Sequence, residues 1–158
     1  MNRAYYKNSI SKFIKENDNS ILGKLSLNHS NRQLEDLQKN AWVKQIEILK
    51  DQLNEFEGQI YFEFAIPRMG KRVDNIIIIN DSIFVVEFKV GGGGFENYAQ
   101  AQVLYYTLDL KNFHEGSHNA KLIPVLLATN AENQHIEMKI PLTTKLSLKQ
   151  IKRALNMY

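Results

Sequence analysis

The sequence contains no cysteine among its 158 residues. This absence excludes a disulfide framework, a thiolate zinc site and a cysteine nucleophile. Any metal must then be held by carboxylate, histidine or carbonyl ligands. Because a protein of the reducing cytosol needs no disulfides, we expect a cytoplasmic protein.

Long apolar runs are also missing. The stretch 76–79 is far too short to span a bilayer, and the first seven residues lack the apolar segment of a signal peptide. We therefore predict that the protein is neither secreted by this route nor inserted in a membrane. The single low-complexity run, four glycines at 91–94, is too short to separate two domains.

The overall composition is that of one folded domain. Hydrophobic residues make up 44% of the chain and charged residues 23%, which allows a sizeable core. Twenty basic against seventeen acidic residues leave a formal charge of +3, which permits nucleic-acid contact without establishing it. We divide the domain into an amino-terminal docking segment at 1–31, a core at 32–130 and a carboxy-terminal tail at 131–158.

Two kinds of helical signal precede the predicted sheet. Residues 8–31 are rich in Asn, Ser and Lys, which indicates a short docking helix followed by a loop. From Arg32 to Gly58 the pattern predicts an amphipathic helix. Its apolar stripe steps by four and three residues through Trp42, Ile46, Leu49, Leu53 and Phe56.

The middle of the chain predicts strands. Residues 60–66 form a β-rich run closed by Pro67, and the runs 72–79 and 82–90 flank Asn80-Asp81, a good pair for a tight hairpin turn. Helical patterns at 95–112 and 147–157 enclose a further strand at 122–129. The hairpin is apolar on both faces, so helices must cover both sides. We predict an α/β (α+β) fold, order αβββαβ, with a mixed sheet of about four strands.

The tight turn fixes the register of the hairpin. If Ile79 pairs with Ser82, opposed residue numbers sum to 161, which places Asp74 across from Glu87. By the same arithmetic Arg72 lies across from Lys89, and all four charged residues share one face.

Two facing carboxylates, with Cβ atoms about 5 Å apart, repel each other unless something offsets their charge. A divalent cation would do so, and hard oxygen ligands of this kind suit Mg²⁺ or Mn²⁺. Lys89, on the same face, would orient or deprotonate an attacking water or offset charge on a phosphate. The alternative is a cross-strand salt-bridge network on a solvated patch. Because the flanking residues are apolar on both faces, we favour a functional site.

These residues resemble a known family. Asp74, followed after a hairpin by Glu87-Phe88-Lys89 and then by a helix carrying Gln102-x-x-x-Tyr106, is similar to the PD-(D/E)XK nuclease superfamily. The stretches 66–74, 86–91 and 108–114 look most like nuclease-like modules fused ahead of bacterial helicase or ATPase domains. The resemblance covers roughly residues 38–130.

The resemblance implies a restriction-endonuclease-like core and metal-dependent hydrolysis of nucleic acid, with DNA the expected substrate. Asp74 and Glu87 would bind Mg²⁺ or Mn²⁺, the backbone carbonyl of Phe88 would also reach the metal, and Lys89 would be the catalytic lysine. Gln102 and Tyr106 would help to position the substrate and the catalytic lysine. The alternative is that they belong to an ordinary half-buried helix face. An alternative function is a catalytically weak or inactive module that binds nucleic acid or a helicase or ATPase partner.

Further site residues are expected around this centre. The superfamily often adds an acidic residue from the first helix, for which Glu35, Glu47 and Glu55 are candidates. We select Glu47 from its distance to the first strand, although it lies roughly 140° from the centre of the apolar stripe. The basic cluster of Arg68, Lys71 and Arg72 would meet phosphates.

Overall fold

The computed structural model describes residues 3–29, 36–67, 70–89, 97–129 and 144–146. The chain forms, in order, β1 (Tyr6–Ser9), α1 (Ile10–Lys15), α2 (Asp18–Asn28), α3 (Asp36–Gln52), β2 (Gln59–Ala65), β3 (Arg72–Ile79), β4 (Ser82–Lys89), α4 (Asn97–Phe113), the 3₁₀ turn η1 (Glu115–Ser117), β5 (Lys121–Ala128) and β6 (Thr144–Leu146).

One mixed sheet runs through the molecule in the spatial order β1-β2-β3-β4-β5-β6. Strands β1 to β4 are antiparallel neighbours, whereas β4 pairs with β5, and β5 with β6, in parallel. A parallel pair needs a crossover, which α4 supplies. The predicted order αβββαβ is confirmed from α3 to β5, and β1 and β6 extend the sheet beyond the four strands expected.

The hairpin of β3 and β4 has the predicted register. Ile79 pairs with Ser82, and the ladder continues to Asn75 and Val86. Asn80 takes a φ of 51° in the turn, a left-handed conformation that asparagine tolerates better than most residues. The turn residues and the apolar alternation therefore agree on one register.

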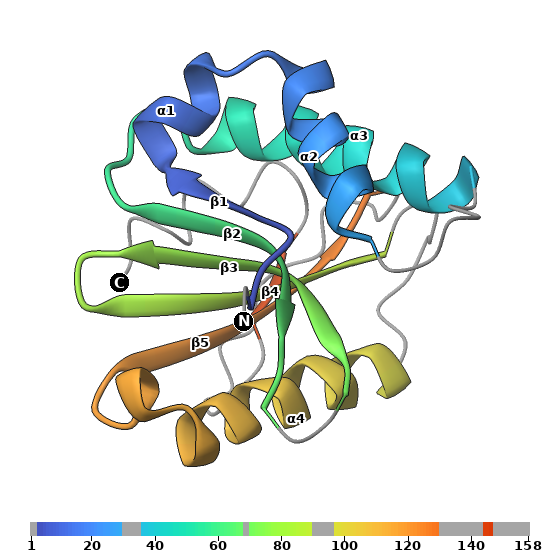
Figure 1. Ribbon diagram of the computed structural model, residues 1–158. Coiled ribbons are helices and arrows are strands. Elements are labelled where there is room, and N and C mark those ends of the chain that lie inside the picture. The colour runs from blue at the N-terminus through green and yellow to red at the C-terminus, as the bar shows by residue number, and fades with distance from the viewer. Residues whose placement is uncertain (1–2, 30–35, 68–69, 90–96, 130–143, 147–158) are drawn as a thin grey trace.

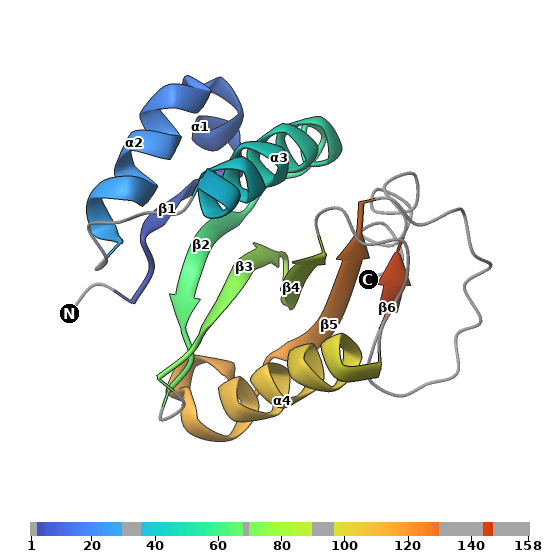
Figure 2. The same ribbon diagram turned by 90° about the vertical axis from the view of Figure 1, so that its right-hand side faces the viewer.

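Helices cover both faces of the sheet, as the apolar hairpin requires (Figures 1 and 2). On one face lies the α1–α3 core, which includes Phe13, Leu25, Trp42, Ile46, Leu49, Leu53, Phe62, Ile77, Phe84 and Val86. On the other face lies the α4 core, which includes Ile66, Val73, Ile76, Ile83, Val85, Ala99, Val103, Tyr106, Leu110 and Leu126.

The predicted stripe of the long helix packs into the α1–α3 core. Trp42 and Leu49 are fully buried, and so is Leu53, although the helix already ends at Gln52. Phe56 packs against the same core from the segment that follows the helix. The burial prediction is confirmed, whereas the helix is shorter than the pattern indicated.

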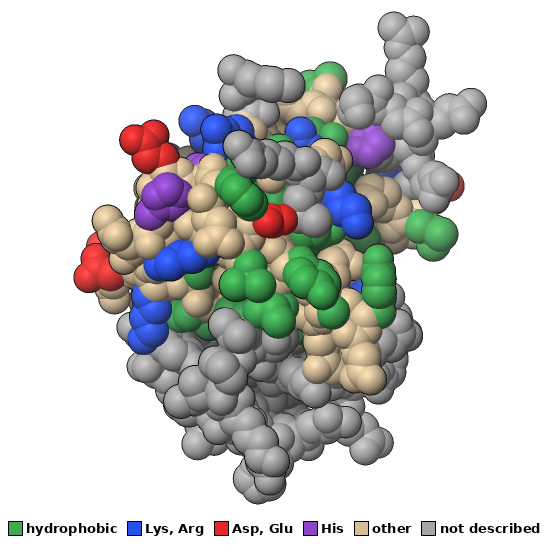
Figure 3. Space-filling model, turned by 90° about the horizontal axis from the view of Figure 1, so that it is seen from below, with side chains coloured by type: hydrophobic (Ala, Val, Ile, Leu, Met, Phe, Trp, Pro, Cys, Tyr) green, Lys and Arg blue, Asp and Glu red, His purple; other side chains and the backbone are tan. Residues whose placement is uncertain are grey.

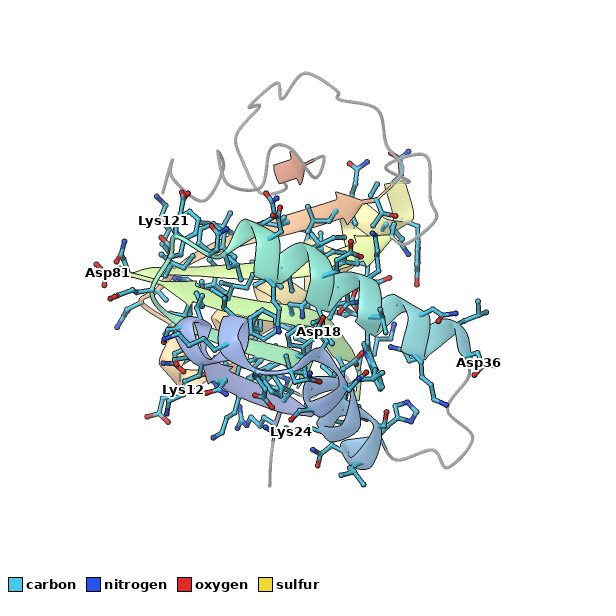
Figure 4. The ribbon with its side chains drawn as sticks, turned by 90° about the horizontal axis from the view of Figure 1, so that it is seen from above. Lys12, Asp18, Lys24, Asp36, Asp81 and Lys121 are labelled. Atoms are coloured by element: carbon cyan, nitrogen blue, oxygen red, sulfur yellow. The ribbon has the colours of Figure 1, made fainter. Side chains whose placement is uncertain are left out.

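The amino-terminal segment is more ordered than predicted. The edge strand β1 precedes the expected short helix, and the helix α2 occupies the region predicted to be a loop. The side chains of Ser9 and Asn17 cap α1 and α2, and Ile21 is fully buried. Asp18, labelled in Figure 4, pairs with Lys50 and so joins α2 to α3. The loop prediction was wrong because the scattered apolar residues of this segment are core residues of the fold.

Strands β2 and β3 bend together toward α4 (Figures 1 and 2). Their pairing skips Glu63 and Asp74, between the pairs Phe62–Asn75 and Phe64–Val73. Glu63 has a φ of 52° at this point. Phe62 belongs to the α1–α3 core but Phe64 packs on the α4 core, so the bend changes the face to which the strand's side chains point.

None of the helices in the described part of the chain is long and apolar enough to cross a membrane. The helix predicted at 147–157 lies outside the described residues.

Candidate active site

Asp74 and Glu87 connect β3 and β4 through their own carboxylates. The backbone N–H of Asp74 donates to Glu87 Oε1 at 3.1 Å, and the backbone N–H of Phe88 donates to Asp74 Oδ2 at 2.7 Å. These bonds lie just beyond the last ladder pair, Asn75 and Val86. The structure therefore brings the two carboxylates together, as the predicted register requires.

Helix α4 closes this end of the hairpin. Gln102 Nε2 donates to Glu87 Oε2 at 3.0 Å, so N–H groups bond both oxygens of Glu87. Tyr106, one turn further along the helix, is buried. Burial and the nearby charge of Glu87 raise the pKa of Tyr106, which keeps its hydroxyl protonated. The predicted pair Gln102 and Tyr106 thus lies against the carboxylates.

Lys89 stands at the carboxyl end of β4, two residues after Glu87. Strand periodicity places it on the same side of the sheet as Glu87, whose side faces α4. Burial raises the pKa of Asp74 and Glu87, and the positive charge of Lys89 opposes that rise in both carboxyls. The end of the strand is held by the Thr129 N–H, which donates to the Lys89 carbonyl at 3.1 Å.

The two carboxyl groups are poorly suited to carrying two negative charges without a cation. Burial raises the pKa of Asp74 to about 7, against the effect of the Phe88 N–H bond. Burial, followed by the charge of Asp74, raises the pKa of Glu87 to about 9. A low-dielectric site disfavours two adjacent anions, and either a proton or a divalent cation relieves the repulsion.

Glu63 is a third acidic residue in this region, and sequence reasoning missed it. The pairing of β2 with β3 places Glu63 at the level of Asp74, and its charge raises the pKa of both Asp74 and Glu87. Trp42 Nε1 and Gln38 Nε2 donate to Glu63 Oε1 at 2.8 and 3.1 Å. Finding Glu63 from the sequence would have required the register between β2 and β3. The segment between these strands contains no tight-turn pair that would fix that register.

The selection of Glu47 as a metal ligand was wrong. Its side chain is exposed on α3 and pairs with Lys44 at 2.9 Å. Helix α3 packs on the face of the sheet opposite α4, and Glu47 lies on the solvent side of that helix. Of the other candidates, Glu55 is exposed and Glu35 lies outside the described residues.

The basic cluster separates into different environments. The Arg72 guanidinium donates to the carbonyls of Arg3 and Glu63 and stacks on the Tyr5 ring, 4.0 Å from its centroid. The predicted pairing of Arg72 with Lys89 was wrong, because the β3–β4 ladder ends at Asn75 and Val86 and Arg72 pairs only on its other side, with Ala65 of β2. Lys71 is exposed, and Arg68 lies outside the described residues.

The residues present fit a divalent cation held by two protein carboxylates. Within the described residues, no group of three or more His, Cys, Asp or Glu side chains is placed to hold a metal. Mg²⁺ is commonly bound through one or two carboxylates and keeps several waters, so Asp74 and Glu87 satisfy that requirement. The metal contact of the Phe88 carbonyl stays a prediction.

Comparisons with protein-family models, curated proteins and solved structures found no match.

Proposed function

We propose that the protein is a metal-dependent nuclease of PD-(D/E)XK type with a restriction-endonuclease-like core, which hydrolyses phosphodiester bonds, with DNA as the expected substrate. The observation that carries the proposal is the adjacency of the buried Glu87 carboxyl and the partly buried Asp74 carboxyl, with Lys89 two residues further along the same strand. Buried like charges are costly, and functional sites are where such arrangements occur.

The chain's own residues have distinct roles in this proposal. Asp74 and Glu87 would hold Mg²⁺ or Mn²⁺, which when bound lowers the pKa of a coordinated water and offsets charge on a phosphate. The Gln102 amide fixes the orientation of Glu87. Lys89, on the same side of β4 as Glu87, would stabilise the charge that develops on a phosphoryl oxygen. The exposed Lys71 offers a phosphate contact.

A second candidate is a module that binds nucleic acid or a helicase or ATPase partner without hydrolysis. The specific observation in its favour is the extent of hydrogen bonding at the site. Both oxygens of Glu87 and one oxygen of Asp74 already accept N–H groups, which ties the carboxylates into the fold. On this alternative the pair would be a structural connection between β3, β4 and α4.

The test is incubation with circular and linear DNA, and with RNA, in buffer containing Mg²⁺ or Mn²⁺. We expect cleavage by the wild type, and its loss in Asp74→Asn, Glu87→Gln and Lys89→Ala. Glu47→Gln is the matched control, because it removes an exposed carboxylate outside the site. Absence of cleavage on every substrate with both metals, or cleavage that survives Lys89→Ala and Asp74→Asn, would contradict the proposal.

A further inference from the structure

Helix α4 exposes an aromatic surface next to the carboxylates. Tyr98 is 68% exposed, Tyr105 is 61% exposed and Leu108 is 40% exposed. Single exposed apolar residues are ordinary on protein surfaces, but here these three share one helix with Phe113, which is 46% exposed. Figure 3, which views the molecule from the side of α4, shows hydrophobic side chains gathered across this face. We name Tyr98, Tyr105 and Leu108 the α4 stripe.

Helix geometry places the α4 stripe at the rim of the site. At about 100° per residue, Tyr98 and Tyr105 lie about 40° and 60° to one side of Gln102. Gln102 itself contacts Glu87. The buried residues Val103 and Tyr106 lie to the other side of Gln102, toward the α4 core. Helix α4 therefore binds the Glu87 carboxylate through Gln102. On the adjacent side of the same helix, the rings of Tyr98 and Tyr105 are exposed to solvent.

We propose that the α4 stripe is a stacking platform for unpaired bases, so that the substrate or ligand is single-stranded nucleic acid. This inference rests on the proposed function, because it places bases beside a phosphodiester-cleaving site. Tyrosine rings stack on any base whose face is free, whereas a duplex buries those faces between neighbouring base pairs. At 1.5 Å per residue the two rings are about 10 Å apart along the helix, which suits two separate bases.

The chemistry of the α4 stripe favours nucleic acid over a protein partner. Two of its three members are tyrosines, whose hydroxyl groups remain hydrated while the ring faces stack. A stable protein interface buries about 800 Å² on each partner, typically from 20 or more residues. Even with Phe113 included, four side chains on one helix fall well short of that, and polar neighbours such as the exposed Asn112 border them.

The test measures binding without hydrolysis. Fluorescence anisotropy in EDTA would compare a labelled oligothymidylate, which forms no duplex, with a labelled duplex hairpin. We expect the wild type to prefer the oligothymidylate. The double variant Tyr98→Leu/Tyr105→Leu keeps apolar surface but loses the rings, and should weaken that binding by about tenfold or more. The double variant Tyr98→Phe/Tyr105→Phe keeps the rings and should bind as the wild type does.

Leu37→Ala is the surface control, because Leu37 is 77% exposed on α3, in the other helical layer. It should leave binding unchanged. Equal affinity of the leucine variant and the wild type, or a wild-type preference for duplex, would overturn the inference. So would sedimentation showing a wild-type dimer that the leucine variant abolishes, together with no oligonucleotide binding, since a second copy would then cover the α4 stripe.

Failure of the inference is distinguishable from failure of the proposed function. The first possible outcome is metal-dependent cleavage that is lost in Lys89→Ala, together with oligothymidylate binding that does not change when Tyr98 and Tyr105 are replaced. That outcome would overturn the proposal of a stacking platform and leave the proposed nuclease function standing. Ring-dependent binding in EDTA without cleavage in Mn²⁺ would overturn hydrolysis and retain the binding surface.

Discussion

The two ends of the β3–β4 hairpin differ although the same two strands form both. Near the turn, from the pair Ile76–Val85 to the pair Ile78–Ile83, the ladder is regular and the side chains are apolar on both faces. At the open end, carboxylates of Asp74 and Glu87 accept backbone N–H groups, beyond the last ladder pair. The regular end supplies packing energy and register. At the irregular end, side-chain carboxylates rather than strand carbonyls accept the backbone N–H groups, and there the candidate site lies.

The largest effect on stability is expected from a substitution in the regular end of the hairpin. Phe84 is buried in the α1–α3 core, so Phe84→Ala should lower the free energy of unfolding by about 3–5 kcal/mol, through lost burial and a cavity. Urea denaturation followed by circular dichroism measures this. The exposed Leu37→Ala should change it by less than about 0.5 kcal/mol. A Phe84→Ala loss as small as that would contradict the importance assigned to the regular end.

The contrast between the two ends also explains what could be predicted from sequence. The β3–β4 register followed from two independent signals, the Asn80-Asp81 turn and the alternation of apolar residues. The bend at Glu63 had no such signal, because it depends on a left-handed backbone at a residue that ordinary strand patterning treats as one more alternating position. Glu47 was selected by its distance along the chain, whereas the packing of α3 turns it to solvent.

The next prediction concerns cation binding at the irregular end. A ligand that binds only the native state stabilises it by about 2.7 kcal/mol at one hundred times its dissociation constant. The melting temperature of the wild type should therefore rise with added Mn²⁺, whereas those of Asp74→Asn and Glu87→Gln should not. A shift retained by both variants would place the cation elsewhere.

In the absence of metal, the same two substitutions should leave stability level or raise it. Asparagine at 74 and glutamine at 87 keep an oxygen that can accept the backbone N–H bonds, and they remove the like-charge repulsion. Urea melts of the metal-free proteins check this. A salt-bridge network would instead lose about 1–3 kcal/mol when one partner is removed, and that loss would contradict our interpretation.

A smaller effect should appear in the pH dependence of the metal-free protein. The raised pKa values of Asp74 and Glu87, about 7 and 9, mean that the folded state holds more protons than the unfolded state above about pH 4. Raising the pH toward 9 should therefore destabilise the wild type, with a slope of at most about 1.4 kcal/mol per pH unit for each group. Glu87→Gln should flatten the curve, measured as unfolding free energy between about pH 5 and pH 9. An unchanged slope would contradict the assignment.

The most direct test of the central claim is calorimetric titration of Mn²⁺ into the metal-free protein at near-neutral pH, where binding of the cation releases the protons held by Asp74 and Glu87. The account predicts binding by the wild type and by the Glu47→Gln control, and its loss in both Asp74→Asn and Glu87→Gln. A wild type that binds no Mn²⁺, or variants of Asp74 and Glu87 that bind it as tightly as the wild type, would contradict a cation site at the open end of the hairpin.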